Sequence, residues 1–142
     1  MVKTPYHEEQ LTDGLIYAKY HPHIHSFTFS NMTKETVDAA YQYITTLDKE
    51  YAEKGIHIQY LYILDDVPYT PYMLTKIKQS LALVSTTLRH SSAVVADTFF
   101  ARVLQAIIVP NIAKDIMQEV RFFTTESEAF EWLTSRQKNS DE

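Results

Sequence analysis

The sequence contains no cysteine and only two glycines in 142 residues. The absence of cysteine excludes disulfide bonds, thiolate nucleophiles and cysteine-based zinc sites. Because glycine occurs only at Gly14 and Gly55, the chain has no glycine-rich phosphate-binding loop, and no serine lies in the glycine turn of a hydrolase nucleophile. These absences remove several enzyme classes, and we expect no catalytic residue and no cofactor.

Positive charge is also scarce, because the sequence has 13 lysines and arginines but 18 aspartates and glutamates, which gives a net charge of −5. No block of basic residues occurs, which disfavours nucleic acid or an anionic membrane as a partner. Apolar runs such as Ile107–Val109 are too short to cross a bilayer, and the first residues contain no apolar signal core. We therefore expect a cytoplasmic protein without a transmembrane segment.

The composition that remains is typical of a globular domain, with 45% hydrophobic and 22% charged residues. A chain of this length fits one domain with a substantial core. We expect a single domain over residues 1–142, with 1–12 as an N-terminal extension and 138–142 as a frayed tail.

Five segments have the pattern of β-strands. They are Leu15–Tyr20, Ile24–Phe29, Ile58–Leu64, Ser92–Asp97 and Val120–Phe123. In the second of these, His25, Phe27 and Phe29 share one face, which we expect to lie against the core.

Four segments have helical periodicity. We predict helices from Asn31 or Thr33 to about Lys54, from Thr70 to Leu88, over Phe99–Val109 with a bend at Pro110 and a continuation towards Met117, and from Ser127 to about Arg136. Strands and helices alternate after the first hairpin, which indicates parallel strands joined by right-handed crossovers. The predicted fold is α/β, with one mixed sheet of about five strands and about four helices.

In its order of elements, the chain resembles the STAS (SpoIIAA-like, anti-sigma-factor antagonist) domains. It is most similar to their single-domain branch, which is also compared with lipid-transfer domains of the CRAL-TRIO type. Three segments carry the resemblance: Leu64–Tyr69, where a central strand runs into an aspartate loop; Ala93–Asp97, followed by Phe100-Ala101-Arg102; and Val120–Leu133, the closing strand and helix. The resemblance implies the STAS fold over nearly the whole chain.

The serine phosphorylation turn of regulatory STAS domains is missing. The corresponding segment is Tyr69–Met73, which has neither an Asp-Ser pair nor a glycine. Thr70 has a hydroxyl at about the right place, but a helix cap with proline at the next position already explains it. The kinase-switch function of the family is therefore not expected here.

Two groups of side chains have the chemistry of metal sites. His21, His23 and His25 alternate and would share one side of an extended chain, but Pro22 indicates a turn, so we interpret them as solvent-exposed hairpin histidines. Asp65, Asp66 and Asp97 follow two predicted strands, where magnesium could bind. We interpret the first two as turn residues and Asp97 as a helix cap, and we predict no metal.

The predicted third helix is apolar nearly all round, with only Arg102 and Gln105 polar between Phe99 and Val109. A deep core, a self-association face or a hydrophobic ligand pocket would each explain the excess apolar surface. Aromatic residues at the start of the preceding helix belong to the same end of the sheet. The resulting candidate surface for a partner or ligand comprises Asp66, Tyr69, Thr70, Tyr72, Met73, Phe99, Phe100, Leu104 and Ile108.

From this surface we expect a non-enzymatic regulatory or scaffolding protein that acts through protein–protein contacts, with a protein partner or a second copy of itself. The alternative is a carrier or sensor of a hydrophobic small molecule or lipid bound between the second and third helices. The lipid-transfer resemblance suggests this alternative.

Overall fold

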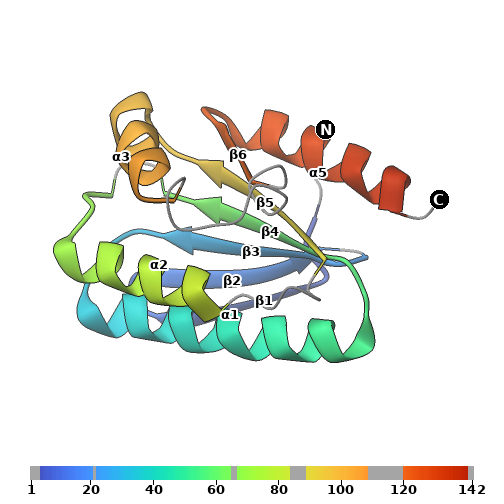
Figure 1. The fold of residues 1–142 in the computed structure, drawn as a ribbon, viewed down its shortest axis with the longest axis horizontal. Coiled ribbons are helices and arrows are strands. Elements are labelled where there is room, and N and C mark those ends of the chain that lie inside the picture. The colour runs from blue at the N-terminus through green and yellow to red at the C-terminus, as the bar shows by residue number, and fades with distance from the viewer. Residues whose placement is uncertain (1–3, 21, 65–66, 84–88, 109–119, 141–142) are drawn as a thin grey trace.

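The computed structural model describes residues 4–20, 22–64, 67–83, 89–108 and 120–140. These residues form six strands and four helices (Figure 1). In chain order they are β1 (His7–Thr12), β2 (Leu15–Tyr20), β3 (Ile24–Phe29), α1 (Lys34–Lys54), β4 (Ile58–Ile63), α2 (Pro71–Leu83), β5 (His90–Val95), α3 (Thr98–Ile108), β6 (Val120–Phe123) and α5 (Glu126–Ser140).

The strands form one mixed sheet in the order β1-β2-β3-β4-β5-β6. The first three strands pair antiparallel, and β3 to β6 pair parallel through helical crossovers. The predicted α/β class and mixed sheet are confirmed, and the predicted bounds of β2, β3 and β6 match the observed ones. The count of about five strands was too low by one.

The strand that sequence analysis missed is β1, which lies within the expected N-terminal extension. Its first four residues are all exposed and polar, so they show no apolar alternation. Main-chain pairing with β2, in which His7 faces Lys19 and Gln10 faces Ile16, needs no apolar side chain. The charged side chains also protect this edge of the sheet against pairing with another chain.

The helix ends follow the predicted caps. Thr33 accepts a hydrogen bond from the backbone N–H of Thr36, and Gly55 ends α1 in the left-handed conformation with φ of 66°. Thr70 and Asp97 accept hydrogen bonds from the third backbone N–H after each of them, at 3.2 and 2.8 Å. The interpretation of both residues as caps is confirmed. The last helix, α5, continues to Ser140, beyond the predicted end at Arg136.

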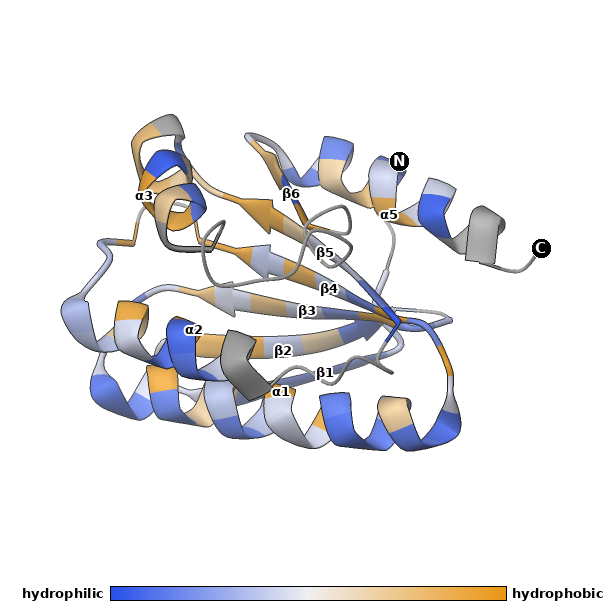
Figure 2. Cartoon of the chain, viewed as in Figure 1, coloured by the Kyte–Doolittle hydropathy of each residue, from blue (hydrophilic) through white to orange (hydrophobic). Residues whose placement is uncertain are grey.

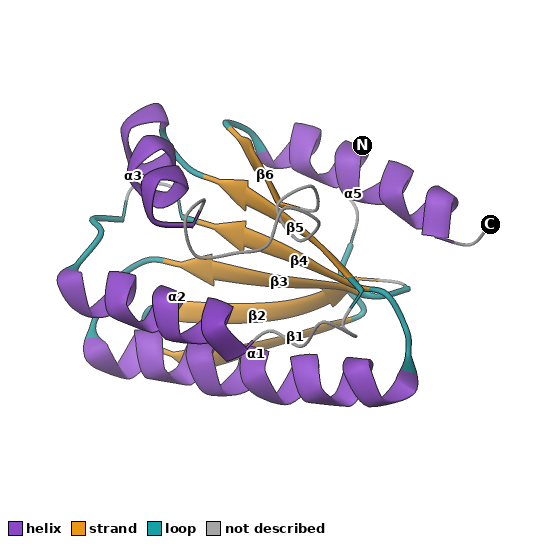
Figure 3. Ribbon diagram, viewed as in Figure 1, coloured by secondary structure: helices purple, strands orange, loops and turns teal. Residues whose placement is uncertain are grey.

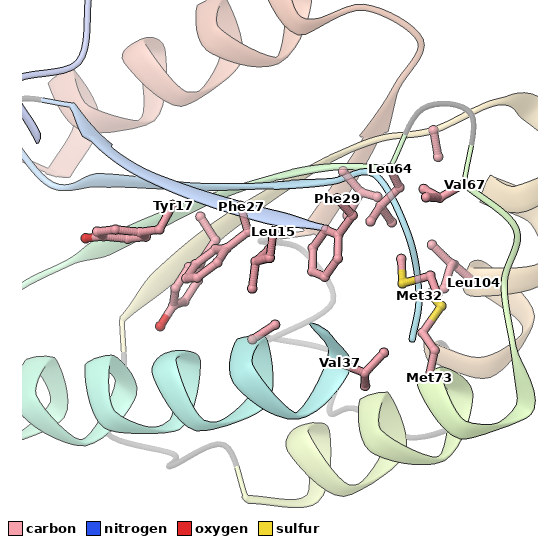
Figure 4. Packing of buried hydrophobic residues seen from close by; sticks show 14 of the residues in the cluster. Leu15, Tyr17, Phe27, Phe29, Met32, Val37, Leu64, Val67, Met73 and Leu104 are labelled. Carbon is pink, nitrogen blue, oxygen red and sulfur yellow. The ribbon is translucent and has the colours of Figure 1, made fainter. Parts of the chain in front are cut away.

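The two faces of the sheet bury separate cores (Figure 3). One core lies between the sheet and helices α1, α2 and α3, and the other lies beneath α5. Both Phe27 and Ile24 of β3 are fully buried, on opposite faces, as their alternation predicts. Figure 4 shows Leu15, Tyr17 and Phe27 extending from the sheet on the side that faces α1.

Position 14 requires glycine because the side chain of Asn31 leaves no room for a β-carbon there. A β-carbon at position 14 would lie 2.2 Å from Cγ of Asn31. The Asn31 carboxamide oxygen accepts hydrogen bonds from the backbone N–H and hydroxyl of Thr33 and from the hydroxyl of Thr36, at 3.3, 3.2 and 2.7 Å. Moving Asn31 aside would therefore disrupt the start of α1.

We expect Gly14→Ala to lower the free energy of unfolding by about 1–3 kcal/mol, the usual range for overpacking. Urea denaturation measures the change. The matched control is Gly55→Ala, where no atom lies within 4 Å of the new methyl group. Only the left-handed backbone conformation disfavours alanine there, which should lower the free energy of unfolding by about 1 kcal/mol. Equal losses at the two glycines would contradict a steric role for Asn31.

Candidate ligand cavity

A cavity of about 190 Å³, partly open to solvent, lies between the sheet and the helices that cover its α1 face. The strands contribute Phe29, Tyr60, Tyr62, His90, Ser92, Val94 and Val120, and segments that follow strands contribute Met32 and Leu64. Helix α1 contributes Val37, Ala40, Tyr41, Ile44 and Asp48, helix α2 contributes Met73, Lys76, Ile77 and Ser80, and α3 contributes Leu104.

The end of the cavity at the carboxyl ends of the parallel strands is apolar. Met32, Met73 and Leu104 come from three separate segments, and Figure 4 shows their side chains near one another, with Leu64 and Val37 close by. All five side chains are buried. This end can accept only an apolar group without loss of hydrogen bonds.

The end of the cavity at the amino ends of the strands is polar. The hydroxyl of Tyr60 donates a hydrogen bond to the carboxylate of Asp48, so β4 and α1 meet there. On β5, the Ser92 hydroxyl lies 3.5 Å from Nδ1 of His90. Figure 2 shows the same gradient, with β5 hydrophilic at its amino end and hydrophobic at its carboxyl end. Polarity therefore changes along the length of the cavity.

The environment of Asp48 opposes a negative charge. Burial raises the pKa of this carboxyl group from 3.8 to about 6, although the hydrogen bond from Tyr60 acts in the opposite direction. Burial also raises the pKa values of the Tyr60 and Tyr62 hydroxyls, so both phenols are neutral donors at physiological pH. The charge of Asp48 therefore changes at a higher pH than that of an ordinary aspartate.

A cationic side chain lies elsewhere on the cavity wall. Nζ of Lys76 is 4.7 Å from the ring centroid of Tyr41 and 5.7 Å from that of Tyr72. The Tyr72 hydroxyl donates to the carboxylate of Asp38, which joins α2 to α1 outside the cavity lining. Among the described residues, Lys76 forms no ion pair with a carboxylate, so the two aromatic rings are the groups that stabilise its ammonium.

The interpretation of the histidines as exposed hairpin residues is wrong for His25. This side chain is 1% exposed, and His21 lies outside the described residues. Nδ1 of His25 lies 2.6 Å from the Tyr17 hydroxyl, and Nε2 lies 2.9 Å from the Tyr51 hydroxyl, which also contacts Nδ1 of His23 at 3.0 Å. Both ring nitrogens have partners, so a neutral imidazole is stable in the core. Burial lowers the pKa of His25 to about 3.

The predicted partner or ligand surface is divided between the outside and the inside of the molecule. Tyr69 and Phe99 are 39% and 66% exposed, with ring centroids 6.2 Å apart. Phe100 is 2% exposed beneath Tyr69, and Met73 and Leu104 line the cavity. Thr70 caps α2, and Tyr72 binds Asp38. Asp65 and Asp66 lie outside the described residues, as does the side chain of Ile108.

Sequence reasoning missed the polar end of the cavity. Asp48 follows Ile44 by one helical turn and precedes Tyr51 by three residues, so it belongs to the buried side of α1. A carboxylate beside a predicted apolar stripe was the signal that could have identified it. Its partner Tyr60 comes from another element, and only the packing of α1 on β4 brings the two together.

No set of three potential ligands among histidine, aspartate and glutamate is placed to hold a metal ion in the described part of the chain. Within the same residues, no helix has the length and apolar character needed to span a membrane. Comparisons with protein-family models, with curated proteins and with solved structures give no significant match.

The raised pKa of Asp48 predicts that the ionisation of this carboxyl group makes the fold less stable. Between about pH 4 and pH 6 the folded state retains a proton that the unfolded state has lost, so this group makes the fold less stable as pH rises. We expect Asp48→Asn, which keeps an acceptor for Tyr60, to remove this loss. Its free energy of unfolding should rise relative to the original protein by about 1–3 kcal/mol between pH 4 and pH 7.

Urea denaturation of both proteins across this range measures the difference. His25 acts with the opposite sign, because its lowered pKa makes the fold less stable as pH falls below 6.5. Both proteins contain His25, so its effect cancels in the difference between them. A difference that stays constant with pH would contradict the raised pKa of Asp48.

Proposed function

We propose that the protein binds a small, mainly apolar molecule in the cavity beneath α1 and α2 and acts as its carrier or sensor. The observation that carries the proposal is the cavity itself, whose walls are mostly aliphatic, aromatic or thioether groups. Protein interiors are packed closely enough that voids larger than a water molecule are few. A mostly apolar space of this size is stabilised when an apolar molecule occupies it.

The volume limits the size of the ligand. A dry apolar cavity of about 150 Å³ can take up benzene, so about 190 Å³ suits a molecule of one or two rings or a short alkyl chain. Larger sites for drug-sized ligands begin at about 300 Å³. The proposed ligand is therefore smaller than a membrane phospholipid.

The proposal is non-enzymatic, and it includes a STAS-like classification of the fold. Its support is the strand and helix order, together with the three segments that resemble that family. The proposed ligand site lies between the sheet and helices α1, α2 and α3. This position is broader than the gap between the second and third helices that the sequence suggested.

Filling the cavity tests this proposal. We expect Ile77→Phe to weaken binding of 1-octanol at least about 10-fold in isothermal titration calorimetry, because the phenyl ring takes the space of the ligand. The same substitution should leave stability within about 1 kcal/mol, since filling a void avoids the cost of overpacking a dense core.

Leu74→Phe is the matched control, because Leu74 is on the same helix and equally half-buried but does not line the cavity. It should bind 1-octanol as the original protein does. Native mass spectrometry of gently purified protein should also show a small bound molecule that denaturation releases. If no apolar compound binds and nothing co-purifies, the carrier proposal fails.

A protein-binding surface is a second candidate function, supported by the exposed pair Tyr69 and Phe99. The two rings lie next to each other and form one exposed apolar patch, and aromatic side chains are enriched at interfaces. The patch lies outside the cavity, so both functions can coexist. A second copy of the chain is the simplest partner for it.

Neighbouring phenylalanines on α3 give a direct test of the patch. We expect Phe99→Glu to leave the free energy of unfolding within about 0.5 kcal/mol, because the side chain is exposed. Phe100→Glu should abolish folding or reduce stability by several kcal/mol, because it buries a charge. In sedimentation equilibrium, the original protein should dimerise and Phe99→Glu should be monomeric. A monomeric original protein would exclude the self-association role.

A further inference from the structure

Asp48 is a carboxylate residue of the cavity lining that retains hydrogen-bonding capacity. Asp48 has two carboxylate oxygens, which together can accept about four hydrogen bonds. Among the described residues, the only hydrogen bond recorded for this carboxylate comes from Tyr60. Asp48 lines the cavity together with Ile44, Tyr62 and Ile77.

The distance between the two ends of the cavity favours an elongated ligand. Tyr60 and Leu64 lie on or next to the same strand, four residues apart, and both line the cavity. At about 3.3 Å per residue, their α-carbons are about 13 Å apart. A ligand that contacts both ends needs a polar group at one end and an apolar body that extends towards Met32, Met73 and Leu104.

We propose that the ligand is an alcohol-type amphiphile, whose neutral hydroxyl group donates a hydrogen bond to the Asp48 carboxylate while its apolar body occupies the rest of the cavity. This inference rests on the proposed function of the same cavity. It assigns Asp48 and Tyr60 to the head of the ligand and the side chains around Leu104 to its tail.

Other head groups fit the polar end less well. A carboxylate or phosphate at this end would place a second negative charge beside Asp48, whereas the cation of the cavity wall, Lys76, lies over the rings of Tyr41 and Tyr72. An ammonium group would lose its hydration in a mostly apolar space, and a buried ion pair recovers that cost only with further hydrogen bonds. An ether or a ketone cannot donate, so it leaves the acceptor capacity of Asp48 unused.

Four probes with the same kind of chain separate these head groups. They are 1-octanol, its isomer 1-methoxyheptane, octanoate and octylamine, each titrated calorimetrically at about pH 8, where the carboxylate is ionised. We expect 1-octanol to bind at least about 10-fold more tightly than 1-methoxyheptane, because only the alcohol can donate to the charged acceptor. Octanoate should bind more weakly than both.

Two aspartate variants then locate the acceptor. Asp48→Leu should make the affinities for 1-octanol and 1-methoxyheptane equal within about 3-fold, mainly because it weakens the binding of 1-octanol. Asp38→Leu is the matched control, because Asp38 is also on α1 and accepts a hydrogen bond from a tyrosine hydroxyl, that of Tyr72, but lies outside the cavity lining. It should retain the preference for the alcohol.

The outcomes separate this inference from the carrier proposal. Equal binding of all four probes, or tighter binding of octylamine or octanoate, would overturn the alcohol assignment and leave the carrier proposal intact. A preference for 1-octanol that persists in Asp48→Leu would overturn the role of Asp48. Absence of binding by every probe would reject both proposals. The probe series on the original protein gives a result even if a variant does not fold.

Discussion

The structure depends on covering both faces of the central parallel strands, because each face carries a cluster of apolar side chains. On one face, Ala129 and Leu133 of α5 pack against the sheet without exposed area. The opposite face is covered by α1, α2 and α3, which approach it from separate crossovers. Three helices that meet over one sheet need not interdigitate completely with it, and the cavity is the space between them.

Strand alternation decides the chemistry of that space. Tyr60 and Tyr62 of β4, and His90, Ser92 and Val94 of β5, are spaced two residues apart and therefore face the same side of the sheet. On β5 this order gives imidazole and hydroxyl groups towards the amino end and an aliphatic group towards the carboxyl end. The same rule sends Ala93 and Val95 to the core beneath α5. One strand thus supplies both a closed core and a polarised cavity wall.

Two polar residues on the α1 face, the buried His25 and the half-buried Asp48, have different partners and different consequences. His25 has a tyrosine hydroxyl on each ring nitrogen, so its neutral form is stable and it strengthens the packing of α1 on the sheet. Asp48 lines the cavity and accepts one hydrogen bond from a tyrosine, which leaves acceptor capacity on its carboxylate. This difference is why the histidine is interpreted as structural and the aspartate as ligand-binding. On α3, the adjacent residues Phe99 and Phe100 face outwards and inwards, which separates a possible contact surface from the core.

The sequence by itself determined the local elements of this protein. Period-two and helical patterns located the strands and helices, and Thr33, Thr70, Asp97 and Gly55 marked helix ends, because caps act over three or four neighbouring residues. The polar edge strand β1 had no such local pattern. Only the tertiary structure decided that His25 is buried, that Asp48 meets Tyr60, and that a cavity remains between them and Leu104. These features depend on how distant segments pack, and no local pattern of residues specifies the space that such packing leaves.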